Sequence, residues 1–280
     1  MLHATFQIDA WLQRSVTCLV VVMSFWGLAD GQEEQWFVDP DWVCQKGSEL
    51  SVKYLEQNSP ESLIRLKAVL PWVVRIEARH TYTPEGYSSN HGSGVLLAEG
   101  RVLTARHVLQ ENVSGEDLQL VVTLADGRVF QAVQERLGEQ DWALLRITDV
   151  GIHQEVLGSD VEQGVAQMGD QTVLAAYPAR QGLGQGGRLQ AFEKREPLQK
   201  GASQLLPVLV VSSVSALKPL ELKPQAGFPP IGGMSGGPVF NQNGEVVGVQ
   251  VSVSRTQDAN GKTLMYRINA VPPPEIRQLD

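Results

Sequence analysis

Cysteine is scarce in this chain, with only Cys18 and Cys44 among 280 residues. Cys18 lies in an N-terminal segment that has the features of a cleaved leader, so Cys44 is left without an intrachain partner. A fold held together by disulfides is therefore excluded, and stability must come from core packing. We interpret Cys44 as a buried, inert cysteine, with a reactive thiol as the alternative.

The chain also lacks clustered positive charge. Its 23 Lys and Arg residues stand against 31 Asp and Glu residues, the net charge is −8, and no run of basic residues occurs. Neutralising phosphates requires grouped Lys and Arg, so we expect no nucleic-acid partner. The hydrophobic fraction of 42% is ample for a buried core, and the length suits one large or two small domains.

The N-terminal apolar run is too short to span a bilayer. It covers 16–29, follows Arg14, and would rise only about 21 Å as a helix, against a hydrocarbon core of about 30 Å. The small residues Gly27 and Ala29 then precede an acidic, polar segment. This pattern predicts a signal peptide over 1–29, export to the periplasm or the extracellular space, and no stable membrane insertion after cleavage. An uncleaved membrane anchor is the alternative.

An N-terminal extension over 30–70 follows the leader. Its first part, to about Gly47, is acidic and irregular. Ser59 and Pro60 predict the start of a short helix, because serine favours the N-cap and proline the first helical position. The apolar face of this helix consists of leucines at helical spacing, Leu63, Leu66 and Leu70.

Beyond Pro71 the chain consists of short apolar runs separated by turn residues. The first group of expected strands is 72–78, 93–98, 101–105, 118–124, 128–137 and 142–147. The second group is 172–176, 205–214, 237–240, 245–253 and 263–268. Regularly spaced short strands without helices between them predict antiparallel barrels or a sandwich rather than α/β units. Two groups of about six strands suit two barrels, at about 71–160 and about 161–270.

The string GGMSGGPVF at 232–240 has the character of a nucleophile loop. Glycines beside Ser235 let the backbone turn sharply and let a substrate carbonyl approach the main chain. Successive N–H groups in such a turn converge on one point, and this predicts an oxyanion hole formed by Gly233 and Ser235. A glycine-rich hairpin loop with an idle serine is the alternative.

A serine nucleophile needs a base, and His107 is the best candidate among the five histidines. It ends the strand-like run RVLTARHVL, so a strand fixes its backbone while the ring emerges at the strand's end. Asp141 begins the run DWALLRI and can accept a hydrogen bond that sets the imidazole tautomer. A structural histidine and a turn aspartate are the alternatives. With Ser235, the three residues predict a catalytic triad.

Four stretches resemble a known family, namely 91–109, 125–145, Tyr177-Pro178 and 232–249. With their triad order His, Asp, Ser, they resemble the chymotrypsin and trypsin-fold serine proteases, most of all the bacterial Do/HtrA type. The resemblance covers roughly 71–255. It implies an all-β fold of two antiparallel six-stranded β-barrels within a protease domain over 71–280, preceded by the short helical extension.

The resemblance also implies roles for individual residues. His107 matches the general base, Asp141 the orienting acid, Ser235 the nucleophile and Gly233 the oxyanion-hole glycine. The expected activity is that of a serine endopeptidase, which hydrolyses polypeptide substrates through an acyl-enzyme. No cofactor and no metal are expected.

Two residues depart from the family's pattern. Met234 stands where zymogen-activated relatives carry an aspartate, so activation by cleavage is not expected. Val251 stands where the family often has a Ser or Thr that contacts the triad aspartate. The stretch after Ser235 is too short for a PDZ domain, which is common in the Do/HtrA type. These departures leave a non-catalytic peptide-binding module of the same fold as the alternative.

Alignment without gaps predicts the primary substrate pocket. It places Pro229 at the base, within the apolar stretch 228–231, and Val251 and Val253 on the strand side. A basic side chain would be buried there without a partner, at a cost of several kcal/mol. We therefore expect small or medium apolar residues, such as Ala, Val or Leu, on the acyl side of the cut.

One further motif, G-x-G-x-x-G at Gly182, Gly184 and Gly187, suggests a dinucleotide site. Such a site requires a following helix and a parallel sheet, and the sequence predicts neither. We expect a surface loop between strands of the second barrel.

Overall fold

The computed structural model describes residues 40–83, 86–109, 118–148, 161–178, 181–183, 189–191, 207–226, 232–259 and 263–272. The predicted signal peptide lies outside these residues. The larger of two units, Val38–Ser254 with Tyr266–Asp280, contains the helices and the candidate site; the described part of the smaller unit lies within 255–265. Within the described part of the chain, no helix has both the length and the apolar character needed to cross a membrane.

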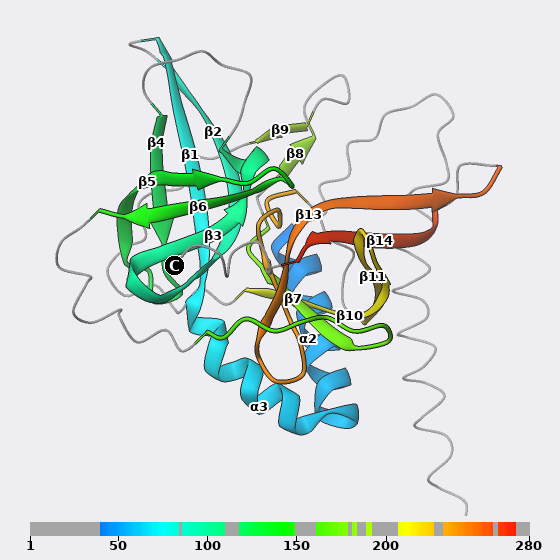
Figure 1. The fold of residues 1–280 in the computed structure, drawn as a ribbon. Coiled ribbons are helices and arrows are strands. Elements are labelled where there is room, and N and C mark those ends of the chain that lie inside the picture. The colour runs from blue at the N-terminus through cyan, green and yellow to red at the C-terminus, as the bar shows by residue number, and fades with distance from the viewer. Residues whose placement is uncertain are drawn as a thin grey trace, which may run out of the picture. The chain divides into compact units, whose positions relative to one another are not determined.

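The first barrel is a closed antiparallel sheet of six strands, in the order β1-β2-β3-β6-β5-β4 (Figure 1). Its strands are β1 (Val73–Thr83), β2 (Gly86–Leu96), β3 (Arg101–Ala105), β4 (Leu118–Thr123), β5 (Val129–Leu137) and β6 (Trp142–Ile147). Apolar side chains fill its interior, among them Val74, Ile76, Leu96, Val102, Val122, Leu145 and Ile147. The short turns η2 (Ala98–Gly100) and η3 (Arg106–Val108) flank β3.

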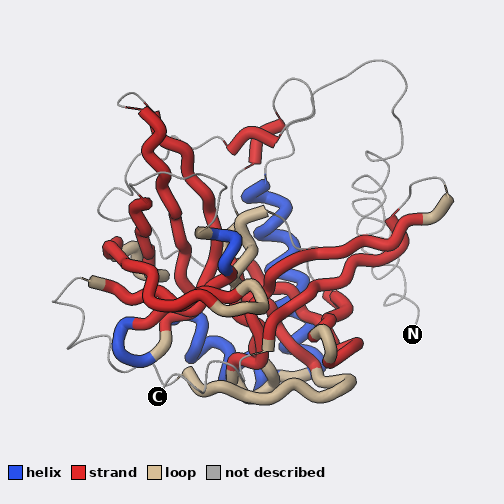
Figure 2. Tube along the Cα trace, turned by 45° about the horizontal axis from the view of Figure 1, so that its top comes forward, coloured by secondary structure: helices blue, strands red, loops and turns tan. Residues whose placement is uncertain are grey.

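The second barrel is also closed, in the order β10-β11-β14-β13-β12-β7. Its strands are β7 (Gln171–Ala176), β10 (Val208–Leu217), β11 (Leu220–Ala226), β12 (Pro238–Phe240), β13 (Val246–Gln257) and β14 (Thr263–Val271). Its interior contains Leu174, Val210, Leu222, Met234, Val247 and Ile268. The prediction of an all-β fold with two six-stranded antiparallel barrels is confirmed, and strands dominate the described chain (Figure 2).

Two details of the second barrel differ from the prediction. β11 was missed, because Pro224 interrupts its alternation of leucines with charged residues. The structure accommodates this proline at a register shift, where Ser212 pairs with Pro224 and Val211 with Ala226. The glycine motif predicted as a loop lies partly in a separate two-stranded sheet of β8 (Gln181–Leu183) and β9 (Leu189–Ala191). Gly182 lies within β8, whereas Gly184 and Gly187 lie outside the described residues.

Among the residues that the structure describes, two α-helices precede the barrels: α2 (Pro40–Asn58) and α3 (Pro60–Val69), followed by the turn η1 (Leu70–Trp72). The prediction of irregular structure to about Gly47 is wrong from Pro40 onward. The helix predicted from Ser59 and Pro60 is α3, with Leu63 and Leu66 buried. Ser59 occupies the N-cap position without capping the helix, because its hydroxyl donates to Gln171 Oε1 at 2.7 Å.

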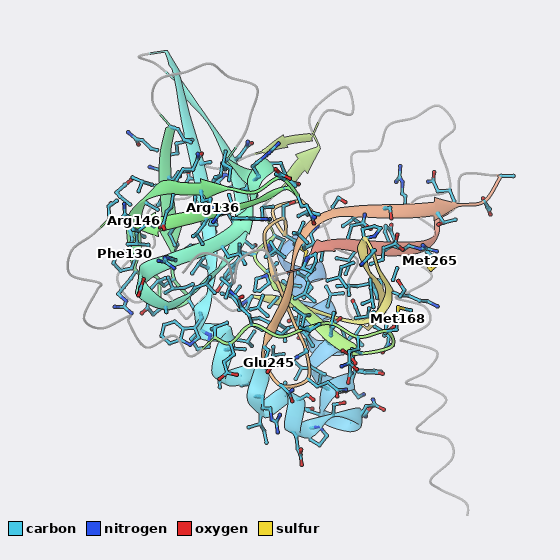
Figure 3. The ribbon with its side chains drawn as sticks, viewed as in Figure 1. Phe130, Arg136, Arg146, Met168, Glu245 and Met265 are labelled. Atoms are coloured by element: carbon cyan, nitrogen blue, oxygen red, sulfur yellow. The ribbon has the colours of Figure 1, made fainter. Side chains whose placement is uncertain are left out.

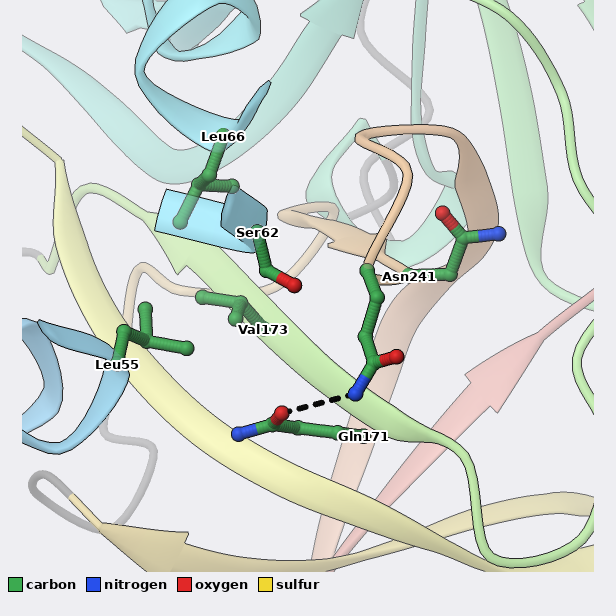
Figure 4. Close-up of a pocket in the computed structure, with 7 residues that line it drawn as sticks. Leu55, Ser62, Leu66, Gln171, Val173 and Asn241 are labelled. Atoms are coloured by element: carbon green, nitrogen blue, oxygen red, sulfur yellow. Dashed lines mark hydrogen bonds between the residues drawn. The ribbon is translucent and has the colours of Figure 1, made fainter. Parts of the chain in front are cut away.

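The helices pack on the second barrel and satisfy backbone groups at its edge. Ser51 Oγ donates to the Leu209 carbonyl at 2.7 Å, and the Leu209 N–H donates to Ser48 Oγ at 3.2 Å. α2 therefore supplies partners where β11 does not reach β10. A small pocket lies between the helices and β7, where Gln242 Nε2 donates to Gln171 Oε1 at 3.0 Å (Figure 4).

Candidate active site

His107 lies in η3, the single 3-10 turn that follows β3. The strand ends at Ala105, as the expected range 101–105 predicts, and the Leu109 N–H donates to the Arg106 carbonyl to close the turn. Val108 is buried and anchors this turn in the core of the first barrel. The His107 side chain is 43% exposed, so its ring reaches solvent while its backbone is held.

Asp141 directly precedes β6, the strand that pairs with β3. Its φ of 63° lies in the left-handed region, which aspartate adopts more readily than most residues with a side chain. Its carbonyl accepts the Arg106 N–H at 3.0 Å. Because Arg106 and His107 are adjacent, this bond brings the carboxylate next to the histidine.

Trp142 holds the start of β6 in place. The side chain is buried, and it lies so close to Gly138 that a Cβ there would come within 2.0 Å of the indole. The guanidinium of Arg136, a residue labelled in Figure 3, lies over the Trp142 ring, 5.8 Å from its centroid. The residue next to Asp141 is thus fixed by packing on more than one side.

Both carboxylate oxygens of Asp141 contact His107. Oδ1 accepts the His107 backbone N–H at 3.0 Å, and Oδ2 lies 2.8 Å from Nδ1. With Nδ1 donating to this carboxylate, neutral His107 keeps its lone pair on Nε2. The free nitrogen can therefore accept a proton.

Ser235 occupies the corner of a tight turn, Met234–Gly237, which we call the nucleophile turn. The Gly237 N–H donates to the Met234 carbonyl at 3.0 Å, and Gly236 has a φ of 84°, as a type II turn requires at its third position. A Cβ on Gly236 would come within 2.1 Å of the Ser93 carbonyl oxygen and 2.2 Å of Thr104 Oγ1. This turn tolerates only glycine there.

The nucleophile turn belongs to the second barrel and docks on the first. The Ser93 N–H in β2 donates to the Ser235 carbonyl at 2.7 Å. Gly236 lies against the backbone of Ala105, the last residue of β3 before the turn that contains His107. The structure thus gathers the segments of all three predicted triad residues. Among the described residues no hydrogen bond joins Ser235 Oγ to the His107 ring, and such contacts are often long in unliganded enzymes.

Gly233 and Ser235, the residues predicted to form an oxyanion hole, lie on either side of Met234 at the start of the nucleophile turn. Gly233 has a φ of 83°, and its carbonyl accepts the Ser93 hydroxyl at 3.0 Å. Within the described part of the chain, the N–H groups of Gly233 and Ser235 donate to no protein acceptor. Met234, between them, is buried in the core of the second barrel, so this position is filled by an apolar anchor.

The predicted pocket residues are only partly described. Pro229 lies outside the described residues. Val251 is half-buried and packs against two hydrophobic clusters, one of which is the interior of the first barrel. As a valine it offers no hydroxyl to Asp141, and Val253 is 36% exposed. Gln250, which the sequence did not single out, is 3% exposed, and its Oε1 has no hydrogen-bond partner among the described residues.

Two other residues of types that could be reactive, His91 and Cys44, are not part of the site as the structure describes it. His91 lies in β2, where its Nδ1 is 3.3 Å from Arg75 Nη2. The side chain of Cys44 is not described. Ser93 could not be recognised as part of the site from the sequence. It lies within 91–109, one of the stretches that resemble the family, but no local pattern distinguishes it there.

The comparison with protein families agrees with this geometry. The model of the trypsin-like peptidase domain matches residues 92–249, more than half of the chain, and this span contains His107, Asp141 and Ser235. The chain therefore belongs to the trypsin-like peptidase domain family. No curated protein matches it.

Proposed function

We propose that this chain is an exported serine endopeptidase in which Ser235 is the nucleophile, His107 the general base and Asp141 the orienting acid. The observation that carries this proposal is the double contact of Asp141 with His107, through the backbone N–H and through Nδ1. An aspartate that only shaped the turn would not also contact both the backbone and the ring of a half-exposed histidine. Placing a proton on Nδ1 leaves Nε2 as the base.

The proposed reaction is acyl transfer in two steps. Ser235 Oγ attacks the carbonyl carbon of a peptide bond while His107 Nε2 takes its proton, and the N–H groups of Gly233 and Ser235 stabilise the oxyanion. His107 then gives the proton to the leaving amine as the C–N bond breaks. Water, deprotonated by His107, attacks the resulting ester, releases the carboxylic acid product and restores Ser235.

Asp141 contributes in two ways. Its carboxylate holds the ring in one orientation and stabilises the imidazolium that forms in each step. Val251 supplies no further donor to this carboxylate, which is 39% exposed. We propose that solvent takes the place of the Ser or Thr hydroxyl found in many relatives.

The proposal extends to location and specificity. The leader over 1–29 directs export to the periplasm or the extracellular space. Apolar residues around Pro229, with Val251 and Val253, favour a small or medium apolar side chain on the acyl side of the cut. The resemblance to the Do/HtrA type remains a prediction.

A peptide-binding module without catalysis is the rival function, favoured by the absence of a Ser235–His107 hydrogen bond among the described residues. Profiling the purified full chain against a fluorogenic peptide library, with Ser235→Ala as the control, separates the two. We expect hydrolysis after Ala, Val or Leu by the wild type, and on the order of a million-fold less by the variant. Equal signals from both proteins would refute the assignment, and a dominant preference for Arg or Lys would refute the pocket alone.

A further inference from the structure

Ser93 is fully buried in β2 and makes hydrogen bonds in several directions around the nucleophile turn. Its N–H donates to the Ser235 carbonyl at 2.7 Å. Its own carbonyl accepts Thr104 Oγ1 at 2.7 Å, which ties it to β3. A residue of the first barrel therefore contacts the nucleophile turn of the second with its main chain.

The Ser93 hydroxyl forms a second link between the barrels. It accepts the Tyr177 N–H at 2.8 Å, just beyond the end of β7. The hydroxyl has one hydrogen to donate, and two carbonyl oxygens lie within reach of it. That of Gly233 is nearer, at 3.0 Å from Oγ, than that of Tyr177, at 3.4 Å. Oγ thus bridges two segments of the second barrel.

The bond to Gly233 matters because glycine does not set its own conformation. At a φ of 83°, Gly233 has other backbone conformations open to it at little steric cost. A carbonyl held toward Ser93 fixes the plane of the peptide that joins Gly233 to Met234, since the unit is rigid. That peptide lies between the two N–H groups proposed to bind the oxyanion.

From these contacts we infer that Ser93 is a positioning residue, whose hydroxyl holds the Gly233 carbonyl and thereby keeps the Gly233 and Ser235 N–H groups convergent. This role rests on the proposed peptidase function. Oxyanion-hole donors act on charge that develops in the transition state, so their displacement should lower kcat and leave KM nearly unchanged.

The test compares Ser93→Ala with Ser51→Ala in the full chain. Both variants lose a buried serine hydroxyl that donates to a backbone carbonyl, which is that of Leu209 for Ser51 and that of Gly233 for Ser93. For Ser93→Ala we expect kcat to fall about 10- to 100-fold at unchanged KM. Affinity for a peptide boronic acid, whose tetrahedral adduct fills the oxyanion hole, should fall by the same factor. Ser51→Ala should keep the wild-type kcat.

A second pair covers the case in which Ser93→Ala does not fold. Ser93→Thr and Ser93→Val have the same shape and differ in the hydroxyl, so Thr should retain kcat and Val should lose it. Equal kcat in the Thr and Val variants, or in Ser93→Ala and Ser51→Ala, would overturn the inference. In that outcome the wild type still hydrolyses peptide and the proposed function stands. A wild type that shows no Ser235-dependent hydrolysis would overturn both.

Discussion

Asp141 binds His107 with both carboxylate oxygens, one on the backbone N–H at 3.0 Å and one at 2.8 Å from Nδ1. This relationship ties the orientation of the ring to the conformation of the turn that carries it. Asp141 also adopts a left-handed φ, which limits the substitutions that preserve the backbone.

The first prediction uses Asp141→Asn, because asparagine tolerates the same φ and keeps the shape while removing the charge. We expect kcat to fall about 10⁴-fold with a melting temperature close to that of the wild type. The matched control is Asp126→Asn, since Asp126 similarly accepts the backbone N–H and Nε of Arg128, at 3.0 and 2.7 Å, outside the site. Peptide hydrolysis by Asp141→Asn within tenfold of the wild type would contradict the role assigned to the carboxylate.

The second prediction concerns Gly236 in the nucleophile turn. Gly236→Ala would place a methyl group 2.1 Å from the Ser93 carbonyl oxygen, besides straining a φ of 84°. The control is Gly127→Ala, because Gly127 also has a φ of 84° but a Cβ there would meet no atom within 4 Å. It therefore measures the cost of the backbone strain alone, which should lower the free energy of unfolding by about 1 kcal/mol. Urea unfolding should give a larger loss for Gly236→Ala than for Gly127→Ala, together with loss of hydrolysis. Equal losses would mean that the turn is not packed as described.

The third prediction concerns the buried amide of Gln250. Since its Oε1 has no partner among the described residues, Gln250→Met should raise the free energy of unfolding by about 1–3 kcal/mol. Gln171→Met is the contrast. The Gln171 Nε2 also has no partner among the described residues, but its Oε1 accepts bonds from Ser59 and Gln242, and the loss of both bonds should destabilise the fold. Destabilisation by Gln250→Met would show that this amide is satisfied in solution.

The fourth prediction concerns export. If Ala29 precedes a signal-peptidase cut, the mature protein should begin at Asp30 or within a few residues of it. N-terminal sequencing of protein from the producing cells decides the matter. Met1 found intact on membrane-bound material would establish an anchor instead.

The strands could be predicted where a short apolar run lies between turn residues, and β3 and β6 match the expected ranges 101–105 and 142–147. β11 could not, because proline normally demotes a strand and only the register shift at Pro224 reveals how it fits. The helix α2, Pro40–Asn58, could not be predicted either. This helix depends on docking, with Ser48 and Ser51 bonded to Leu209 in β10, and local propensity does not report that.

The candidate site likewise contains residues that the sequence indicates and one that it does not. Ser235, His107 and Asp141 could be chosen as candidates from the sequence, because a serine nucleophile needs a base and that base needs an acceptor, and the three residues lie at strand ends or in a tight turn. Ser93 could not, because its hydroxyl bonds Gly233 across 140 positions of sequence and leaves no local pattern. Only the docking of one barrel on the other brings the two residues together.

The most direct test of the central claim is covalent labelling of the purified chain with a fluorophosphonate probe, which reacts with serines that a neighbouring base activates. The proposed site predicts one adduct, mapped by mass spectrometry to Ser235, that disappears in Ser235→Ala and falls by orders of magnitude in His107→Ala. A folded wild-type chain that takes no label, or that is labelled equally after Ser235→Ala, would contradict the assignment of Ser235 as an activated nucleophile.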